Sequence, residues 1–269
     1  MAHPHSPPSR HHAPPWAWAG CGAVLGLVLA SVLLAPARWL AQALAQFSGE
    51  RVQLQQAQGT VWDGTARLVL RAGTDATDAS VMPSPVQWRL RPRWDGLALT
   101  VAAPCCLDTP WRWQARAGWQ GVQLQADDLP ASASHWPAAL LSGLGTPWNT
   151  VQLQGTLALH TQGLQITLGR DHWSLQGSAT VDGLGLRTVL STLQPLGSYR
   201  LALQGGATPN LTLSTLQGQL QLSGQGQLTQ GRWHFTGEAR SDEAAQGALG
   251  NLLNIIGRRE GARSVITVG

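Results

Sequence analysis

Apolar and polar side chains alternate one by one through most of the chain after residue 50. In 52–55, 86–91 and 122–125, valine, leucine or tryptophan takes every second position, and glutamine or arginine takes the positions between. A period of two is typical of a β-strand whose sheet has one buried face and one wet face. Glycine-containing turns separate such segments at short spacing, which indicates successive hairpins. We therefore expect a mainly β fold built on a curved antiparallel sheet.

Three segments depart from this alternation. Apolar residues recur there three or four positions apart, in 40–47, in 186–193 ahead of Pro195, and in 249–256 ahead of Gly257. This spacing predicts a few short helices, because it places the apolar side chains on one helix face. Glycine suits the position after the third helix as a C-cap. A last strand over 264–268 is expected to return to the sheet.

Residues 59–66, Gly-Thr-Val-Trp-Asp-Gly-Thr-Ala, predict a tight reversal early in the alternating region. Gly59 and Gly64 permit positive φ angles in such a turn. The Trp62 ring between them is expected to fold over the start of the sheet, since large aromatic side chains prefer burial. We interpret the role of the segment as packing; the alternative is that Trp62 binds a ligand.

An apolar run over residues 16–35 precedes the alternating region. Its 20 residues include no charged side chain, and a helix needs ~20 residues to cross the hydrocarbon core of a bilayer. Tryptophans lie near both ends of the run, where indole rings favour the membrane–water boundary. The run predicts a single transmembrane helix over 16–37. A cleaved signal peptide is the alternative, because residues 35–37 read Ala-Pro-Ala, but the run is longer than a typical signal core.

The anchor divides the chain into a tail at 1–15, the transmembrane helix at 16–37 and a β-rich domain at 38–269. The domain has 269 − 37 = 232 residues, enough to bury a sizeable core. Within the anchor, Gly22 and Gly26 form a GxxxG step, which lets two membrane helices approach closely. A homodimer through these glycines is one interpretation. The other is that small residues are simply common in apolar helices.

Composition gives no argument for nucleic acid as a partner. All 18 basic residues are arginine, but charged residues make up only 12% of the chain, and no basic block contains interleaved aromatics. None of the three cysteines has the spacing of a zinc site. The neighbours Cys105 and Cys106 could form a strained bridge in an oxidising compartment, or one of them could be buried.

The sequence contains no recognisable catalytic motif. It lacks HExxH, GxSxG and the phosphate-binding GxxxxGK[ST] pattern, and no close carboxylate pair suggests acid–base chemistry. Four histidines lie in the tail, at positions 3, 5, 11 and 12, where they could hold a metal only loosely. Asp127-Asp128 and Asp171-His172 are interpreted as exposed turn residues. We expect no enzyme, no cofactor and no metal site.

Arginines provide the candidate contact residues. Arg89, Arg91 and Arg93 occupy alternate positions and so share one face of a strand. Arg112 and Arg116 are spaced similarly on a later strand. Such a face suits acidic side chains of a partner or anionic lipid headgroups. The alternative is a solvated sheet face.

Three motifs form a set: the turn at 59–66, Val-Gln-Trp-Arg-Leu-Arg-Pro at 86–92, and Leu-Leu-Asn-Ile-Ile-Gly-Arg-Arg-Glu-Gly at 252–261. In this order the chain resembles protein N of the bacterial type II secretion system over essentially its whole length. The turn also occurs in the wider group of AsmA-like envelope proteins. The resemblance implies an inner-membrane protein with a cytoplasmic N-terminus and a periplasmic β-rich domain. Such a protein is an accessory part of the machine that exports folded proteins through an outer-membrane secretin.

Two functions are compatible with these features. The first is a structural component, whose sheet edge or arginine face contacts other inner-membrane secretion subunits or the secretin. The second is a lipid carrier, because in AsmA-like proteins a curved sheet shields acyl chains in an apolar groove. Helices near Leu190 and Leu252 that close the concave face favour the first, whereas an open apolar trough favours the second. We expect closure, since the apolar helix faces need burial against the sheet.

Overall fold

The computed structural model describes residues 16–73, 78–119, 121–169, 173–229, 232–241, 245–261 and 263–268. The chain forms two units, residues 1–35 and residues 36–269. The expected tail at 1–15, with its histidines, and the pair Asp171-His172 lie outside the described residues.

The described part of unit 1 is the helix α1 (Trp16–Leu33), whose valine and leucine side chains are exposed. The helix has 18 residues, which span about 27 Å at ~1.5 Å per residue. It ends ahead of Ala35-Pro36, because a residue that precedes proline is disfavoured in the helical region. Among the described residues, no helix is long and apolar enough to cross a membrane. The transmembrane helix predicted over 16–37 is therefore not supported.

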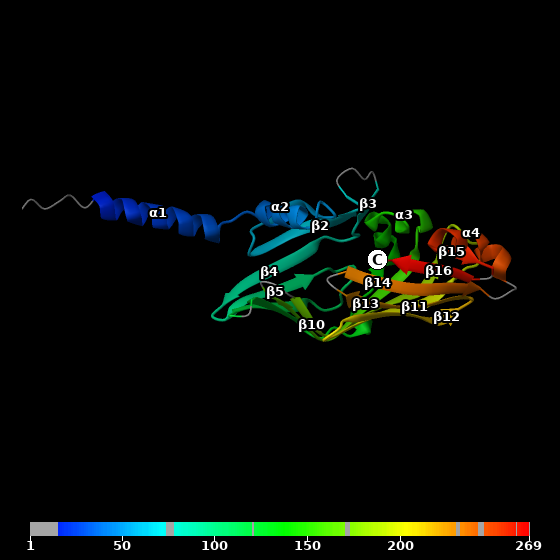
Figure 1. Cartoon of the computed structure of the whole chain (residues 1–269). Coiled ribbons are helices and arrows are strands. Elements are labelled where there is room, and N and C mark those ends of the chain that lie inside the picture. Colours follow the sequence, from blue (N-terminus) through cyan, green and yellow to red (C-terminus); the bar gives the residue numbers. More distant parts are fainter. Residues whose placement is uncertain are drawn as a thin grey trace, which may run out of the picture. The chain divides into compact units, whose positions relative to one another are not determined.

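Unit 2 is built on an open antiparallel sheet of sixteen described strands. In chain order they are β1 (Val52–Gly59), β2 (Asp63–Arg71), β3 (Ala79–Val81), β4 (Val86–Arg93), β5 (Gly96–Ala102), β6 (Trp111–Gly118), β7 (Gly121–Ala126), β8 (Trp136–Pro137), β9 (Gln154–Leu168), β10 (Trp173–Arg187), β11 (Gly197–Gly206), β12 (Asn210–Gly218), β13 (Leu220–Thr229), β14 (Arg232–Ser241), β15 (Arg258–Glu260) and β16 (Arg263–Val268). Across the sheet the order is β1-β2-β4-β5-β6-β7-β9-β10-β11-β12-β13-β14-β16-β15, with β3 beside β2 and β8 beside β9. The predicted antiparallel sheet is confirmed, and Figure 1 shows that it curves.

The alternating pattern explains which face of the sheet is buried. On β4, Val86, Trp88 and Leu90 point to one side, and Trp88 is only 5% exposed, while Arg89 and Arg91 are exposed on the other side. We call the face that carries Trp88 the inner face and the opposite face the outer face. A strand with such alternation has to place its apolar set against a core, which the helices supply.

Helices pack against the inner face. They are α2 (Ala37–Phe47), the 3-10 helices η1 (Ala131–Ala133) and η2 (Ala138–Leu144), α3 (Trp148–Val151) and α4 (Gln246–Ile256). The helices predicted at 40–47 and 249–256 are confirmed, and Gly257 is the C-cap of α4. Near β1, α2 packs through Ala37 and Leu40 in one cluster with Ala66 and Trp88.

The largest core cluster fills the inner face over β10 to β14. Leu249, Leu252 and Leu253 of α4 are at most 2% exposed and pack there with Tyr199 of β11. The cluster also holds residues of η2 and α3, and in Figure 1 α3 and α4 lie on the same side of these strands. Leu190 packs against the cluster as a partly buried side chain. Burial of α4 thus closes this part of the inner face, as the sequence predicts.

The helix predicted at 186–193 is wrong, because β10 continues to Arg187 and turns and bends follow it. Thr188 donates its hydroxyl hydrogen to Val151 O and accepts the N–H of Leu190 (3.3 Å). Ser191 Oγ accepts the N–H of Leu193 in the same way (3.1 Å). Hydroxyl groups that bond nearby backbone groups compete with helical hydrogen bonds, which accounts for the irregular segment.

The turn between β1 and β2 differs in part from its prediction. Gly59 has a φ of +86°, as expected. Gly64 has no positive φ; a Cβ on it would lie 2.4 Å from Cζ2 of Trp88, so close approach of that ring requires glycine here. The ring that packs on this turn is that of Trp88, whose Nε1 donates to Val61 O (3.0 Å), whereas Trp62 is half-buried.

Cys105 and Cys106 form a disulfide, with their Cα atoms 3.7 Å apart. Cys106 is fully buried in a second inner-face cluster with Met82, Leu107 and Leu129. Pairing and burial, which the sequence left as alternatives, therefore occur together.

Candidate functional site

Five arginines lie together on the outer face, on strands β4 and β6. The two strands flank β5, and their pairing sets the alignment: Arg89 and Arg112 pair with the same β5 residue, and so do Arg93 and Arg116. We call this set the arginine strip; it consists of Arg89, Arg91, Arg93, Arg112 and Arg116. The structure thus brings together the two arginine groups that the sequence placed on separate strands.

One carboxylate links the two strands of the strip. Asp95 Oδ2 accepts from Arg116 Nε at 3.0 Å, and Asp95 Oδ1 lies 3.4 Å from Arg93 Nε. Partial burial acts to raise the pKa of Asp95, but the hydrogen bond from Arg116 and the charges of both arginines outweigh it, so the pKa is lowered. Asp95 therefore stays ionised and neutralises part of the positive charge at this end of β4.

The rest of the strip keeps most of its charge. Arg89 Nε donates to Asp63 Oδ2 at 2.9 Å, a pair in which both side chains are more than half exposed. Within the described part of the chain, neither Arg91 nor Arg112 forms an ion pair. Exposed pairs contribute only about 0–1 kcal/mol, so the strip is a cationic surface rather than a stabilising network.

The two edges of the sheet differ strongly. β15 has three residues, all charged, and Arg258 and Arg263 both donate to Glu260, at 2.7 and 3.1 Å. These two arginines, Arg258 first, lower the pKa of Glu260. β1 has eight residues with no charge and no proline. Because short, charged strands resist edge-to-edge pairing and long uncharged ones do not, β1 is the unprotected edge.

Backbone groups of β1 alternate between β2 and the open edge. Arg71 N–H donates to Arg51 O at 2.8 Å, which fixes the phase of the ladder. In an antiparallel pair every second residue bonds the neighbouring strand, so Gln53 turns its backbone groups to β2. Val52 and Leu54 turn theirs away from β2.

Leu54 is the residue of β1 whose outward backbone groups remain available to an added strand. The Ser48 hydroxyl accepts from Val52 N–H (3.0 Å) and donates to Val52 O (3.2 Å), which caps the start of the edge. Beyond Leu54 the register shifts between Gln55 and Gln58, where a bulge interrupts regular pairing. An added strand would therefore bond the middle of β1, around Leu54.

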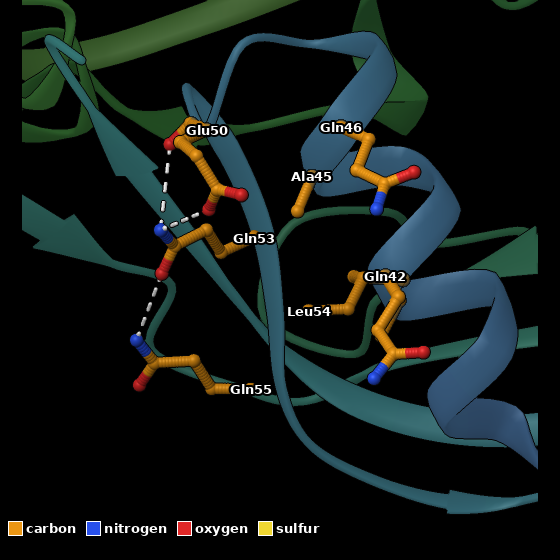
Figure 2. A pocket seen from close by; sticks show the side chains of 8 residues that line it. Gln42, Ala45, Gln46, Glu50, Gln53, Leu54 and Gln55 are labelled. Atoms are coloured by element: carbon orange, nitrogen blue, oxygen red, sulfur yellow. Dashed lines mark hydrogen bonds between the residues drawn. The ribbon is translucent and has the colours of Figure 1, made fainter. Parts of the chain in front are cut away.

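A groove of about 310 Å³ runs between α2 and β1 (Figure 2). It is lined by Ala41, Gln42, Ala45, Gln46, Glu50, Gln53, Leu54 and Gln55. Figure 2 shows Leu54 pointing toward α2, whereas Gln53 and Gln55 point to the other side of the strand. A hydrogen-bond chain orders the glutamines: Gln55 Nε2 donates to Gln53 Oε1 (3.2 Å), and Gln53 Nε2 donates to Glu50 Oε2 (3.0 Å). The groove combines a free strand edge with a helix wall of small and amide side chains.

The glycines of the predicted helix-pairing step lie on α1. A Cβ on Gly22 or Gly26 would meet no atom within 4 Å. Both positions therefore have space for a neighbouring helix, and pairing through them stays a prediction.

Chemistry-bearing side chains do not gather in the described ranges. No group of three or more histidine, cysteine, aspartate or glutamate side chains that could hold a metal is found among them. Asp127 and Asp128 are exposed, as expected, and Asp128 Oδ1 accepts the N–H of Gly163 (2.7 Å). A depression of about 530 Å³ over β12 to β14 contains one carboxylate, Glu238, which is ion-paired to Arg240 at 2.7 Å.

This open sheet has one edge protected by charge, at β15, one unprotected edge, at β1, and a cationic face. These features define a class of protein that acts by binding other molecules through its surfaces. Residues 50–267 match the family model of type II secretion system protein N. The match spans most of the chain, so the chain belongs to this family and is a component of type II secretion. No curated protein and no solved structure matches it.

Proposed function

We propose that this chain is an accessory component of the type II secretion system that binds another secretion subunit by accepting an extended segment at the open edge of β1. The observation that carries the proposal is the unprotected edge itself, in a family whose members serve secretion. Proteins whose sheets have long uncharged edges cover them with a partner or a further strand. The partner is another inner-membrane subunit or a periplasmic module of the secretin.

The chemistry of strand addition fits the groove between α2 and β1. Main-chain hydrogen bonds to Leu54 would provide affinity, and alternate side chains of the added segment would enter the space beside Ala41 and Ala45. Gln42 and Gln46 line the helix side, where they can bond a polar segment. Arg89, Arg91 and Arg93 form a second proposed contact, suited to negative charge on a partner.

Attachment to the inner membrane, with the N-terminus in the cytoplasm and the β domain in the periplasm, belongs to the same proposal. Its support is the family, which has an envelope role, and the exposed valine and leucine side chains along α1. Pairing of α1 through Gly22 and Gly26 would make the protein a homodimer. Release of the chain from membranes by alkaline carbonate would contradict membrane insertion.

The AsmA-like lipid carrier is the second candidate, and it has less support. Its groove would need an inner face left open along the sheet. Leu249, Leu252 and Leu253 of α4 instead occupy the inner face over β10 to β14 with almost no exposure. Burial of these side chains leaves that part of the face without room for acyl chains.

Lysines on the open edge are expected to impair export. Gln53→Lys with Gln55→Lys adds two charges to β1, and charged side chains discourage pairing along an edge. We expect the export rate of secreted enzymes to fall about tenfold, the factor that corresponds to ~1.4 kcal/mol of lost binding. Export is measured as enzyme activity in the medium of cells in which the variant replaces the natural chain.

The matched control places the same change on a central strand. Gln123 and Gln125 alternate on β7 just as Gln53 and Gln55 do on β1, but both edges of β7 are already paired. Gln123→Lys with Gln125→Lys should leave export unchanged. Equal export by the two double variants would show that β1 is not the contact.

A further inference from the structure

Exposed tryptophans are concentrated at one end of the sheet in unit 2. Among the described residues of this unit, five tryptophans are exposed: Trp39, Trp94, Trp119, Trp148 and Trp173. Trp94 and Trp119 project most, at 94% and 108% exposure. A tryptophan side chain that is left fully in water loses the burial that normally stabilises it, so a cluster of such residues points to a contact surface.

Strand register places Trp94 and Trp119 at the same end of the sheet. Trp94 lies in the turn between β4 and β5, and Trp119 lies in the turn between β6 and β7. Gly96, the first residue of β5, pairs with Arg116 near the end of β6. The two turns therefore occupy the same end of the sheet. We call it the tryptophan end.

Apolar side chains of the inner face continue the surface beside these turns. They pair across the strands, Val122 of β7 with Leu168 of β9 and Leu168 with Trp173 of β10. Together with Leu97 of β5 they are 41–46% exposed. Other strands also expose apolar side chains, among them Leu201 of β11 (37%), but the tryptophan end gathers four of them beside Trp94 and Trp119.

The chain also enters unit 2 at the tryptophan end. Pro36, the first residue of the unit, bridges Thr60 in the turn between β1 and β2. Asp63, just after this turn, pairs with Arg89, so the turn lies toward the C-terminal end of β4. Trp39, in the first turn of α2, is half exposed. A fourth tryptophan thus joins the same end, while Trp148 lies elsewhere, on α3.

Positive charge borders the tryptophan end on the outer face. Arg91, Arg93 and Arg116 are the members of the arginine strip that lie nearest this end, beside the first residues of β5. Asp95, whose side chain is 19% exposed, pairs with two of them. Among these four groups the excess is 3 − 1 = 2 positive charges. Arginine beside exposed tryptophan complements an anionic phosphate layer above an apolar interior.

We propose that the tryptophan end docks on the surface of an anionic phospholipid bilayer, with Trp94 and Trp119 at the headgroup boundary and Arg91, Arg93 and Arg116 against lipid phosphates. A bilayer fits better than a protein because the side chains stand at the tips of separate turns, and neither of the two grooves described above includes them. A fluid surface accepts such tips without matching their shape. This inference goes beyond the proposed secretion role: it assigns Arg91 and Arg93 to lipid in place of the second protein contact proposed above, and it does not depend on the contact at β1.

Quenching by lipid-borne nitroxides tests the docking in the full chain. Trp119→Cys in a Cys21→Ser background carries the fluorophore, because Cys105 and Cys106 are bonded to each other. The protein is reconstituted in vesicles of phosphatidylethanolamine and phosphatidylglycerol that contain a headgroup nitroxide lipid. We expect quenching about threefold stronger than for the control Trp148→Cys, because Trp94, which this variant keeps, and the neighbouring arginines hold position 119 at the headgroup boundary.

The charge of the surface is tested with the same label. Replacement of Arg91, Arg93 and Arg116 by glutamine should reduce the quenching at position 119 about threefold, because each arginine near an anionic surface contributes attraction. Arg187→Gln, at the other end of the sheet, should not change it. In phosphatidylcholine vesicles, which carry no net charge, quenching at position 119 should be weak with or without the three arginine replacements.

Two results would overturn the proposal. One is equal quenching at positions 119 and 148. The other is a photoreactive side chain at position 119 that captures protein and no phospholipid in cells, which would assign the surface to a protein partner. Because the vesicles contain no other secretion subunit, failure there leaves the secretion role untouched, and failure of the export experiment leaves the docking untouched.

Discussion

Replacement of Trp88 by alanine is expected to lower the free energy of unfolding of unit 2 by about 3–5 kcal/mol. The ring is 5% exposed and packs with Ala37, Leu40 and Ala66, which joins α2 to the first strands. Its Nε1 also donates to Val61 O at 3.0 Å, so the variant leaves a partly buried carbonyl without this donor. The loss is large because the ring packs directly on the backbone of Gly64, which has no side chain to fill the cavity that the variant leaves.

Urea denaturation of the full chain in detergent measures this change. Trp94→Ala is the matched control, because Trp94 is 94% exposed and its loss should alter the free energy of unfolding by no more than about 0.5 kcal/mol. Since α2 forms one wall of the groove beside β1, amide exchange in 37–59 should also accelerate in Trp88→Ala. A stability equal to that of the control would refute the account of this turn.

Leu253→Ala is expected to destabilise unit 2 by about 2–5 kcal/mol. Leu253 has no exposed surface, and α4 closes the largest core cluster with it. Truncation leaves a cavity between α4 and the sheet, because neighbours in a well-packed core relax only partly. The expected consequence is a lower denaturation midpoint with an unchanged dependence on urea concentration.

The neighbouring Ile255 provides the control on the same helix. Its side chain is 39% exposed, so Ile255→Ala should cost much less than Leu253→Ala. If the two variants were equally stable, α4 would not be the buried closure described above. The AsmA-like alternative would then regain support, because the inner face over β10 to β14 would be accessible.

Local sequence patterns predict most of the strands because each strand carries its own alternation. The segments 52–55, 86–91 and 122–125 lie in β1, β4 and β7, and 249–256 lies in α4. The segment 186–193 has helical spacing but is irregular, because Thr188 and Ser191 bond nearby backbone groups through their hydroxyls. Such hydroxyl groups compete with helical hydrogen bonds for backbone partners, and the spacing of apolar residues does not reveal this competition.

Contact surfaces depend on which strands become neighbours, and sequence patterns show this less well. The alternate arginines of β4 were visible in the sequence, but their alignment with β6 follows from the pairing of both with β5. β15 lies outside β16 at the C-terminal edge, an order that successive hairpins do not predict. Trp94 and Trp119 were missed; the available signal was a tryptophan in a glycine-containing turn, where no core requires one.

In-cell photocrosslinking from the open edge of β1 tests the central claim most directly. A photoreactive amino acid replaces Gln55, at the rim of the groove beside α2, in cells with an active secretion system, and captured proteins are identified by mass spectrometry. The same replacement at Gln125 on β7 is the control. The account predicts that position 55 captures a type II secretion subunit and that position 125 does not. Capture of the same proteins from both positions, or of no secretion subunit from position 55, would contradict it.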